Sequence, residues 1–261
     1  MMRIAEQTEL SFQGKSSRAS VFQDLCEDWN ISLEGAWADI FGQKLKEAAR
    51  TSNKPSVRTL SLFAGADDLD IGFHDAGFEI THAVEIEKKF SRSLAKNAEQ
   101  GGYIERTQII CSDVRNFSLP KNTEIDFIIG GPPCQTFSAA GRRASGVLGT
   151  TDERGTLFQE YVRLLDDLQP KGFLFENVYG IVGAEGGKPW RQIQKAFGDA
   201  GYKIFWRILD TADYGVAQHR ERLIIVGTKE KEFLFPRPTH GPDSQSKLAY
   251  FSAESALKGC F

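Results

Sequence analysis

The stretch Ile125-Asp-Phe-Ile-Ile-Gly-Gly-Pro-Pro-Cys-Gln-Thr-Phe-Ser138 decides the fold of this 261-residue chain. Its first five residues predict a buried strand, because a short apolar run bounded by glycines is typical of one. Two prolines then stiffen the turn, and Cys134 follows at the edge of the predicted sheet. Ligands of open α/β sheets bind at this edge, so the Cys134 thiolate is a candidate nucleophile. The alternative is a buried structural cysteine, which is the usual fate of a free cysteine.

From residue 57 onward, apolar runs alternate with helical stretches. Strands are expected at 57–63, 79–84, 108–111, 125–129, 173–175, 203–209 and 223–227. Helices are expected up to about residue 77, at 87–100, at 157–168 and around 192–197. This alternation predicts an α/β fold with a doubly wound, mostly parallel, seven-stranded sheet. About a dozen residues join the last two strands, which suits a hairpin, so the last strand is expected to be antiparallel.

Residues 1–54 are predicted to form a separate helical extension. Apolar side chains at helical spacing suggest two helices, through Val21, Phe22, Leu25 and Trp29 and through Trp37, Ile40, Phe41, Leu45 and Ala48. Such a face packs on its own domain or docks on a partner subunit. After a linker at 51–56, residues 55–240 are expected to form the α/β domain and residues 241–261 a C-terminal tail.

Composition narrows the class of protein. No apolar run approaches the roughly 18 residues needed to span a membrane, and no signal peptide opens the chain, so no membrane partner is expected. The four cysteines form no CxxC pair, which argues against a metal site or a disulfide framework and favours a reducing cytoplasm. The net charge of −3 does not suit a stand-alone nucleic-acid binder. Any contact with nucleic acid must come from a local basic patch or from a partner chain.

Polar residues follow the first three predicted strands. Phe63-Ala-Gly65-Ala-Asp67-Asp68 opens a helix, and a glycine turn there is a usual place for a nucleoside-type cofactor. Glu85 lies where a carboxylate could accept both ribose hydroxyls of such a cofactor, and Asp113 follows the third strand. The alternatives are helix capping by an aspartate and exposed acidic loop residues.

A carboxylate and two arginines follow near the last strands. Glu176-Asn177-Val178 ends the fifth strand, where partial desolvation favours the neutral form of the carboxyl. Gln218-His-Arg220-Glu-Arg222 leads into the last strand, and alternate strand residues share a face. Arg220 and Arg222 could therefore converge on one site, or form a pair of surface arginines.

Taken together, three motifs resemble the cytosine-5 DNA methyltransferase family. They are Gly131-Pro-Pro-Cys-Gln-x-Phe-Ser138, Glu176-Asn-Val178 and Gln218-x-Arg-x-Arg222, in this order. Arg154-Gly-Thr-Leu-Phe158 and the loop 141–149 also match, and the resemblance covers about residues 59–240. It implies the fold of S-adenosylmethionine-dependent methyltransferases and a DNA (cytosine-5)-methyltransferase of the restriction-modification type. The expected location is the prokaryotic cytoplasm, in association with the nucleoid.

The resemblance also implies a role for each matching residue. Cys134 would attack C6 of a cytosine flipped out of double-stranded DNA, Glu176 would act at N3, and Arg222, supported by Arg220, would hold the carbonyl. The implied cofactor-binding residues, for S-adenosylmethionine, are Phe63, Ala64, Gly65, Glu85, Ile86, Asp113, Val114, Pro133 and Leu157. The implied substrate-binding residues are Gln135, Ser138, Arg142, Arg143, Asn177, Val178 and Gln218. The loop 138–150 would be a lid over the base, or otherwise a flexible surface loop.

Two features depart from the family's pattern. Asp67 and Asp68 stand where the family has two glycines, which let the backbone approach the cofactor closely. After His240, neither the target-recognition region nor the last two family motifs are found, so a second polypeptide is expected to carry them, as in a few split enzymes. The alternatives are a degenerate methyltransferase-fold module with impaired cofactor binding, a relative that methylates a tRNA cytosine, and a generic nucleotide-binding protein.

Overall fold

The computed structural model describes most of the chain from residue 56 onward. The described residues are 30, 44, 47, 56–66, 68–99, 101–102, 104–133, 157–230, 232–242, 244 and 247–257. The expected helices of residues 1–54, Asp67, the side chain of Asp68 and the segment 134–156 therefore lie outside the described residues. Two compact units are present, and the larger one comprises Asn53–Asp210 and Arg220–Phe235.

The larger unit is built on one seven-stranded sheet of order β3-β2-β1-β4-β5-β7-β6. The strands are β1 Val57–Leu62, β2 Phe78–Glu85, β3 Gln108–Cys111, β4 Phe127–Gly130, β5 Gly172–Val178, β6 Lys203–Asp210 and β7 Glu221–Thr228. The first five strands pair in parallel, and β7 pairs antiparallel with both β5 and β6. The predicted doubly wound, mostly parallel sheet with an antiparallel last strand is confirmed.

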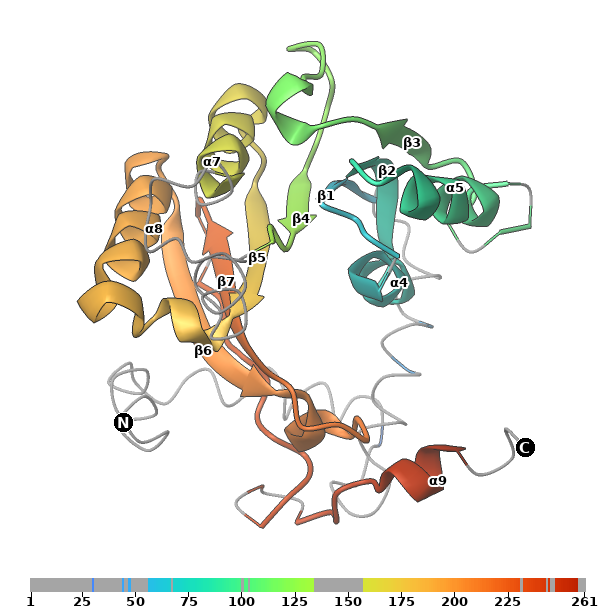
Figure 1. Ribbon diagram of the computed structural model, residues 1–261, viewed down its shortest axis with the longest axis vertical. Helices are drawn as coiled ribbons and strands as arrows, with labels where there is room; N and C mark the ends of the chain where they lie inside the picture. The colour runs from blue at the N-terminus through green and yellow to red at the C-terminus, as the bar shows by residue number, and fades with distance from the viewer. Residues whose placement is uncertain are drawn as a thin grey trace. The chain divides into compact units, whose positions relative to one another are not determined.

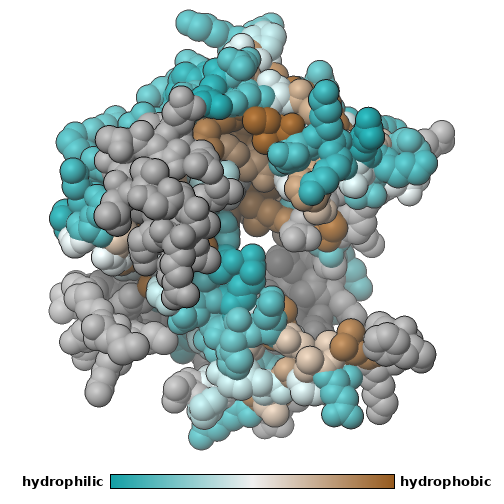
Figure 2. All heavy atoms as spheres, in the orientation of Figure 1, coloured by the Kyte–Doolittle hydropathy of each residue, from teal (hydrophilic) through white to brown (hydrophobic). Residues whose placement is uncertain are grey.

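Helices cover both faces of the sheet (Figure 1). They are α4 Asp68–Asp75, α5 Lys88–Asn97, α7 Leu157–Leu168 and α8 Lys188–Asp199, with short 3₁₀ turns η1 Val114–Asn116, η3 Tyr179–Ile181 and η4 Ala184–Gly187. Successive residues of β4 belong to opposite faces of the sheet. Ile128 packs in the core with α7 and α8, and Ile129 packs in the core with α4 and α5. The outward sides of α5 and α8 are hydrophilic (Figure 2). No helix in the described ranges is long and apolar enough to cross a membrane.

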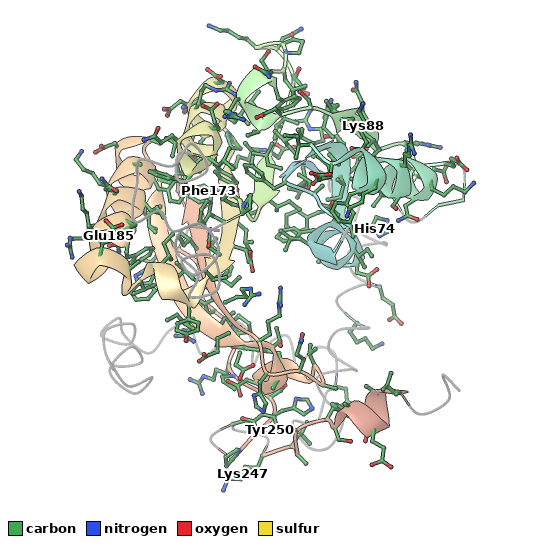
Figure 3. The ribbon with its side chains drawn as sticks, in the orientation of Figure 1. His74, Lys88, Phe173, Glu185, Lys247 and Tyr250 are labelled. Carbon is green, nitrogen blue, oxygen red and sulfur yellow. The ribbon has the colours of Figure 1, made fainter. Side chains whose placement is uncertain are left out.

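Aromatic side chains fill the core beneath α7 and α8. Phe173, labelled in Figure 3, lies 4.6 Å from Phe197 and 5.8 Å from Tyr161 between ring centroids. The buried Tyr161 hydroxyl lies 3.0 Å from the carbonyl oxygen of Ile128 and 2.9 Å from that of Leu174. These contacts tie α7 to β4 and β5, the two strands that lead to the predicted site.

Several strand boundaries differ from the sequence prediction, those of β4 and β5 among them. The fourth strand begins at Phe127 instead of residue 125. Just before it, the Asp126 amide bonds to the Arg58 carbonyl of β1, and the Asp126 side chain joins an ion cluster. The fifth strand extends to Val178 instead of residue 175, because the antiparallel pairing with β7 continues from Gly172 to Val178. Glu176 therefore lies within a paired strand and not after it.

Asp126 links the amino ends of β1, β4 and β5. Its carboxylate lies 2.8 Å from Arg58 Nε and 2.7 Å from Lys171 Nζ, and its side chain is 12% exposed. The hydrogen bond from Arg58 is the main reason that the pKa of Asp126 falls to about 2. A depressed carboxyl pKa stabilises the fold above the unfolded-state pKa of about 4, and this contribution disappears as the pH falls toward 2.

We therefore expect Asp126→Asn to lower the free energy of unfolding by about 1 kcal/mol at pH 7. The effect is small because water screens the attraction between Asp126 and the exposed Lys171 ammonium. Urea denaturation between pH 3 and pH 7 measures this effect. The difference between variant and wild type should shrink steadily toward pH 3. A difference that stays constant with pH would mean that the ion cluster is not its source.

The smaller unit includes Thr211–His219 and the described part of Pro236–Phe261. Its centre is Asp213, whose carbonyl oxygen accepts hydrogen bonds from the Thr239 and His240 amides and whose carboxylate lies 2.9 Å from the Tyr250 hydroxyl. A short helix, α9 Ala253–Leu257, follows. The domain division at residues 54 and 240 stays a prediction.

Candidate active site

The turn after β1 is fixed by the end of β2. Phe63 and Gly65 have left-handed backbone conformations, with φ of 57° and 60°. The carboxylate of Glu85 accepts the amide of Gly65 at 2.8 Å through Oε2 and the amide of Glu87 at 2.7 Å through Oε1. The Ala64 amide donates to the Val84 carbonyl at 3.1 Å. Glu85 therefore sets the spacing of two loops at the carboxyl edge of the sheet.

The turn after β3 lies beside this pair of loops. Asp113 caps η1 by accepting the Arg115 amide at 2.9 Å, and its carboxylate also pairs with the Arg115 guanidinium at 2.6 Å. These hydrogen bonds from Arg115 lower the pKa of Asp113. Val114 is buried in the core, whereas Ile86 is 58% exposed.

These residues fit S-adenosylmethionine by the chemistry of their groups. An ionised carboxylate has about four acceptor sites, and the amides of Gly65 and Glu87 use two of those on Glu85. The remaining sites suit two ribose hydroxyls, and the exposed Ile86 side chain offers an apolar surface to a base. A Cβ on Gly65 would meet little, but its positive φ disfavours other residues.

Two successive glycines leave no room for side chains where β4 ends. A Cβ on Gly130 would lie 2.6 Å from the Leu62 carbonyl oxygen, and a Cβ on Gly131 would lie 2.6 Å from Glu176 Oε2. Asn177 is 4% exposed, and its side-chain Nδ2 donates to the Pro132 carbonyl at 3.2 Å. The end of β5 thus holds the Gly-Pro-Pro segment that leads to Cys134. Asn177, predicted to bind substrate, has its amide engaged with this segment.

Glu176 and Arg222 form an ion pair across β5 and β7, with Arg222 Nε 2.8 Å from Glu176 Oε1. Val178 lies opposite Arg222 in the antiparallel register, so Glu176 and Arg222 share one face of the sheet. Burial raises the pKa of Glu176, and the charges of Arg222 and Arg220 oppose this rise. The carboxyl is therefore more readily neutral than one in water and can donate a hydrogen bond.

The structure describes only part of the site residues predicted from the sequence. Pro133 is exposed at the end of the Gly-Pro-Pro segment, Leu157 begins α7 with a partly buried side chain, and Val178 ends β5. Arg220 precedes β7, and its amide donates to Asp210 at 2.9 Å. Cys134, Gln135, Ser138, Arg142 and Arg143 lie outside the described residues, and Gln218 belongs to the smaller unit. Within the described ranges, no group of three His, Cys, Asp or Glu side chains could hold a metal ion.

The contact between Gly131 and Glu176 was not predicted from the sequence. The only signal for it is the second glycine of the Gly130-Gly131 pair, and a glycine alone does not say what fills the space beside it. The same holds for the bond from Asn177 to Pro132, which joins residues 45 positions apart. Both contacts depend on the pairing of β4 with β5.

The resemblance implies a catalytic role for Glu176, and small displacements of a catalytic group are costly. We therefore expect Gly131→Ala to reduce the methyl transfer implied by the resemblance by about 10- to 100-fold. The new Cβ would push the Glu176 carboxylate, the far end of a flexible side chain, so the fold should tolerate it. The matched control is Gly183→Ala, where a Cβ would meet nothing within 4 Å. Initial rates and thermal melts of both variants check this. Equal rates for the two variants would exclude Gly131 as a spacer for Glu176.

Comparison with known proteins agrees with this arrangement. Residues 57–257 match the model of the family described as C-5 cytosine-specific DNA methylase. The chain is 42% identical over 186 residues to Type II methyltransferase M.FnuDI of Fusobacterium nucleatum, covering 70% of this chain and 51% of that protein. It is 39% identical over 201 residues to Type II methyltransferase M.AquIA of a Picosynechococcus species, covering 73% and 79%.

A solved structure is also similar. An Escherichia coli protein encoded within a prophage, described as a DNA modification methyltransferase, superposes with a TM-score of 0.59 at 28% identity. The superposition covers 77% of this chain and 54% of that protein. The chain spans about half the length of most curated relatives it matches.

Proposed function

The chain belongs to the C-5 cytosine-specific DNA methylase family, and from this premise we propose that it is the catalytic part of a DNA (cytosine-5)-methyltransferase. Its substrate is a cytosine of double-stranded DNA, and its cofactor is S-adenosylmethionine. The observation that carries the proposal is the placement of Glu176 at the edge of the sheet. Its carboxyl lies against Gly131, three residues before Cys134, and pairs with Arg222.

Cys134 is the proposed nucleophile. Its thiolate forms a bond to C6 of the cytosine, which places electron density on C5. A cytosine inside a duplex cannot present this face to a thiol, so the base is flipped out of the stack first. Loss of the C5 proton and release of Cys134 from C6 restore the aromatic ring after methylation.

Glu176 and Arg222 hold the flipped base during this attack. The neutral Glu176 carboxyl donates a hydrogen bond to N3, which offsets the charge that develops in the ring. Arg222, already oriented by Glu176, holds the base carbonyl oxygen, and Arg220 adds positive charge nearby. Asn177 keeps the Pro132 carbonyl in place and so fixes the path of the chain toward Cys134.

S-adenosylmethionine, when bound, supplies an electrophilic methyl group. Phe63, Ala64 and Gly65 would line its amino-acid end, and Glu85 would accept its ribose hydroxyls. Ile86 and the turn at Asp113 and Val114 would hold its base, with Pro133 and Leu157 completing the site.

A second polypeptide would carry the region that reads the DNA sequence. The net charge of −3 supports this, because a chain of this charge attracts DNA phosphates only weakly by itself. Gln135, Ser138, Arg142, Arg143, Val178 and Gln218 are the residues of this chain proposed to contact the base or the DNA backbone, and residues 138–150 are the proposed lid.

Calorimetric titration of S-adenosylhomocysteine into the purified chain tests the cofactor site. Binding in the micromolar range is expected, and Glu85→Ala should weaken it, because the loops at Gly65 and Glu87 then lose their common acceptor. If the wild-type chain does not bind, the titration is repeated with Asp67→Gly/Asp68→Gly. Recovery of binding would favour the degenerate module over a working enzyme. Absence of binding in both titrations would contradict a cofactor site formed by this chain alone.

A further inference from the structure

Arg163 joins α7 to the turn that follows β3. Its Nη2 donates to the carbonyl oxygen of Val114 at 3.1 Å and to that of Phe117 at 2.9 Å. These carbonyls belong to the first residue of η1 and to the residue directly after it. Figure 1 shows this turn beside α7.

The guanidinium is oriented from its own helix. Its Nε lies 2.8 Å from Glu160 Oε2, and its Nη1 lies 3.0 Å from Asp167 Oδ2. A planar guanidinium with Nε and Nη1 fixed presents the N–H groups of Nη2 in one direction. The contacts to Val114 and Phe117 therefore do not depend on a freely moving side chain, although the side chain is 34% exposed.

The turn is held from two sides. Within it, Asp113 binds the amide and the guanidinium of Arg115. From outside, Arg163 fixes the carbonyls of Val114 and Phe117. The side chains of Val114 and Phe117 are buried against the same core as α7, so both the backbone and the side chains of the turn depend on that helix.

We infer that Arg163 is a positioning residue for cofactor binding. It acts through the Asp113–Val114 turn and does not touch the ligand itself. This inference rests on the proposed function, in which that turn holds the base of S-adenosylmethionine. It also gives α7 a role beyond packing, since one helix would carry both Leu157 at the site and the arginine that fixes the turn.

Two measurements on the purified chain test the inference. The first is the Kd of S-adenosylhomocysteine, and the second is hydrogen exchange without ligand at the amides of Asn116 and Phe117, which bond within the turn. Arg163→Met should raise the Kd about tenfold, because the site loses geometric precision. It should also speed exchange at both amides about tenfold, because the turn opens more often.

The matched control is Lys195→Met, which removes the i,i+4 ion pair with Asp199 on α8, a helix of equal length. It should leave the Kd and the two exchange rates within about twofold of wild type. Wild-type values for Arg163→Met would overturn the inference. If Arg163→Met does not fold, Arg163→Lys replaces it. An ammonium lacks the planar fork of a guanidinium, so wild-type values for Arg163→Lys would overturn the inference equally.

Failure of the two proposals can be told apart. A wild-type chain that does not bind S-adenosylhomocysteine contradicts the proposed cofactor site. The exchange rates, measured without any ligand, still decide whether Arg163 holds the turn.

Discussion

Replacing Cys134 with serine is expected to lower methyl transfer by at least about 10⁴-fold. Serine nearly matches cysteine in size, but its hydroxyl is protonated at neutral pH and cannot add to C6 as a thiolate does. The measurement is incorporation of labelled methyl groups into DNA by the complete enzyme, with the proposed second polypeptide present. The Kd of S-adenosylhomocysteine should stay within about twofold of wild type, because the thiol is not part of the proposed cofactor site.

A mass measurement tests the covalent step itself. DNA in which 5-fluorocytosine replaces cytosine has no proton to lose at C5, so the bond between Cys134 and C6 should persist after methylation. The complete enzyme should therefore gain the mass of the DNA, and Cys134→Ser should not. Cys111→Ser is the control, since Cys111 is a free, exposed cysteine at the end of β3. An adduct on Cys134→Ser, or its loss from Cys111→Ser, contradicts the assignment of the nucleophile.

The sheet could be predicted from the sequence because its strands are short apolar runs separated by helices and glycine turns. The parallel pairing of the first five strands follows from connections between them that are long enough for crossovers. The antiparallel last strand follows from a connection that is short for a crossover. The resemblance also implied that Glu176 and Arg222 act on one base, Glu176 from the fifth strand and Arg222 from the last. In the structure the two side chains form an ion pair of 2.8 Å.

The contacts that set the site depend on strand register, and register is not visible in local sequence. Glu176 touches Gly131 and Asn177 binds Pro132 only because Gly130 pairs with Phe175 in β4 and β5. The role of Glu85 was predicted as binding ribose, whereas its carboxylate also fixes two backbone amides. Arg163 was not singled out because an arginine on an amphipathic helix is ordinarily a solvated residue.

Glu176→Gln is expected to lower methyl transfer by about 10²- to 10³-fold. Glutamine keeps the shape and can donate to N3, but it cannot transfer a proton and loses the ion pair with Arg222. Rates of methyl transfer by the complete enzyme at saturating S-adenosylmethionine give the size of the effect. The matched control is Glu221→Gln on β7, which keeps the backbone carbonyl that Arg222 Nη1 contacts at 2.8 Å; its rate should stay within about twofold of wild type.

The pH profile separates proton donation from mere positioning. Burial raises the pKa of Glu176, so the donor form persists to higher pH than for an exposed carboxyl and is lost as the pH rises through that pKa. The proposed Cys134 thiolate has the opposite dependence, so the wild-type enzyme should show a bell-shaped profile. In Glu176→Gln the alkaline limb should disappear, because an amide donates at every pH, while the acidic limb should remain. An unchanged alkaline limb would mean that another group titrates there. Glu176 would then serve only to orient Arg222.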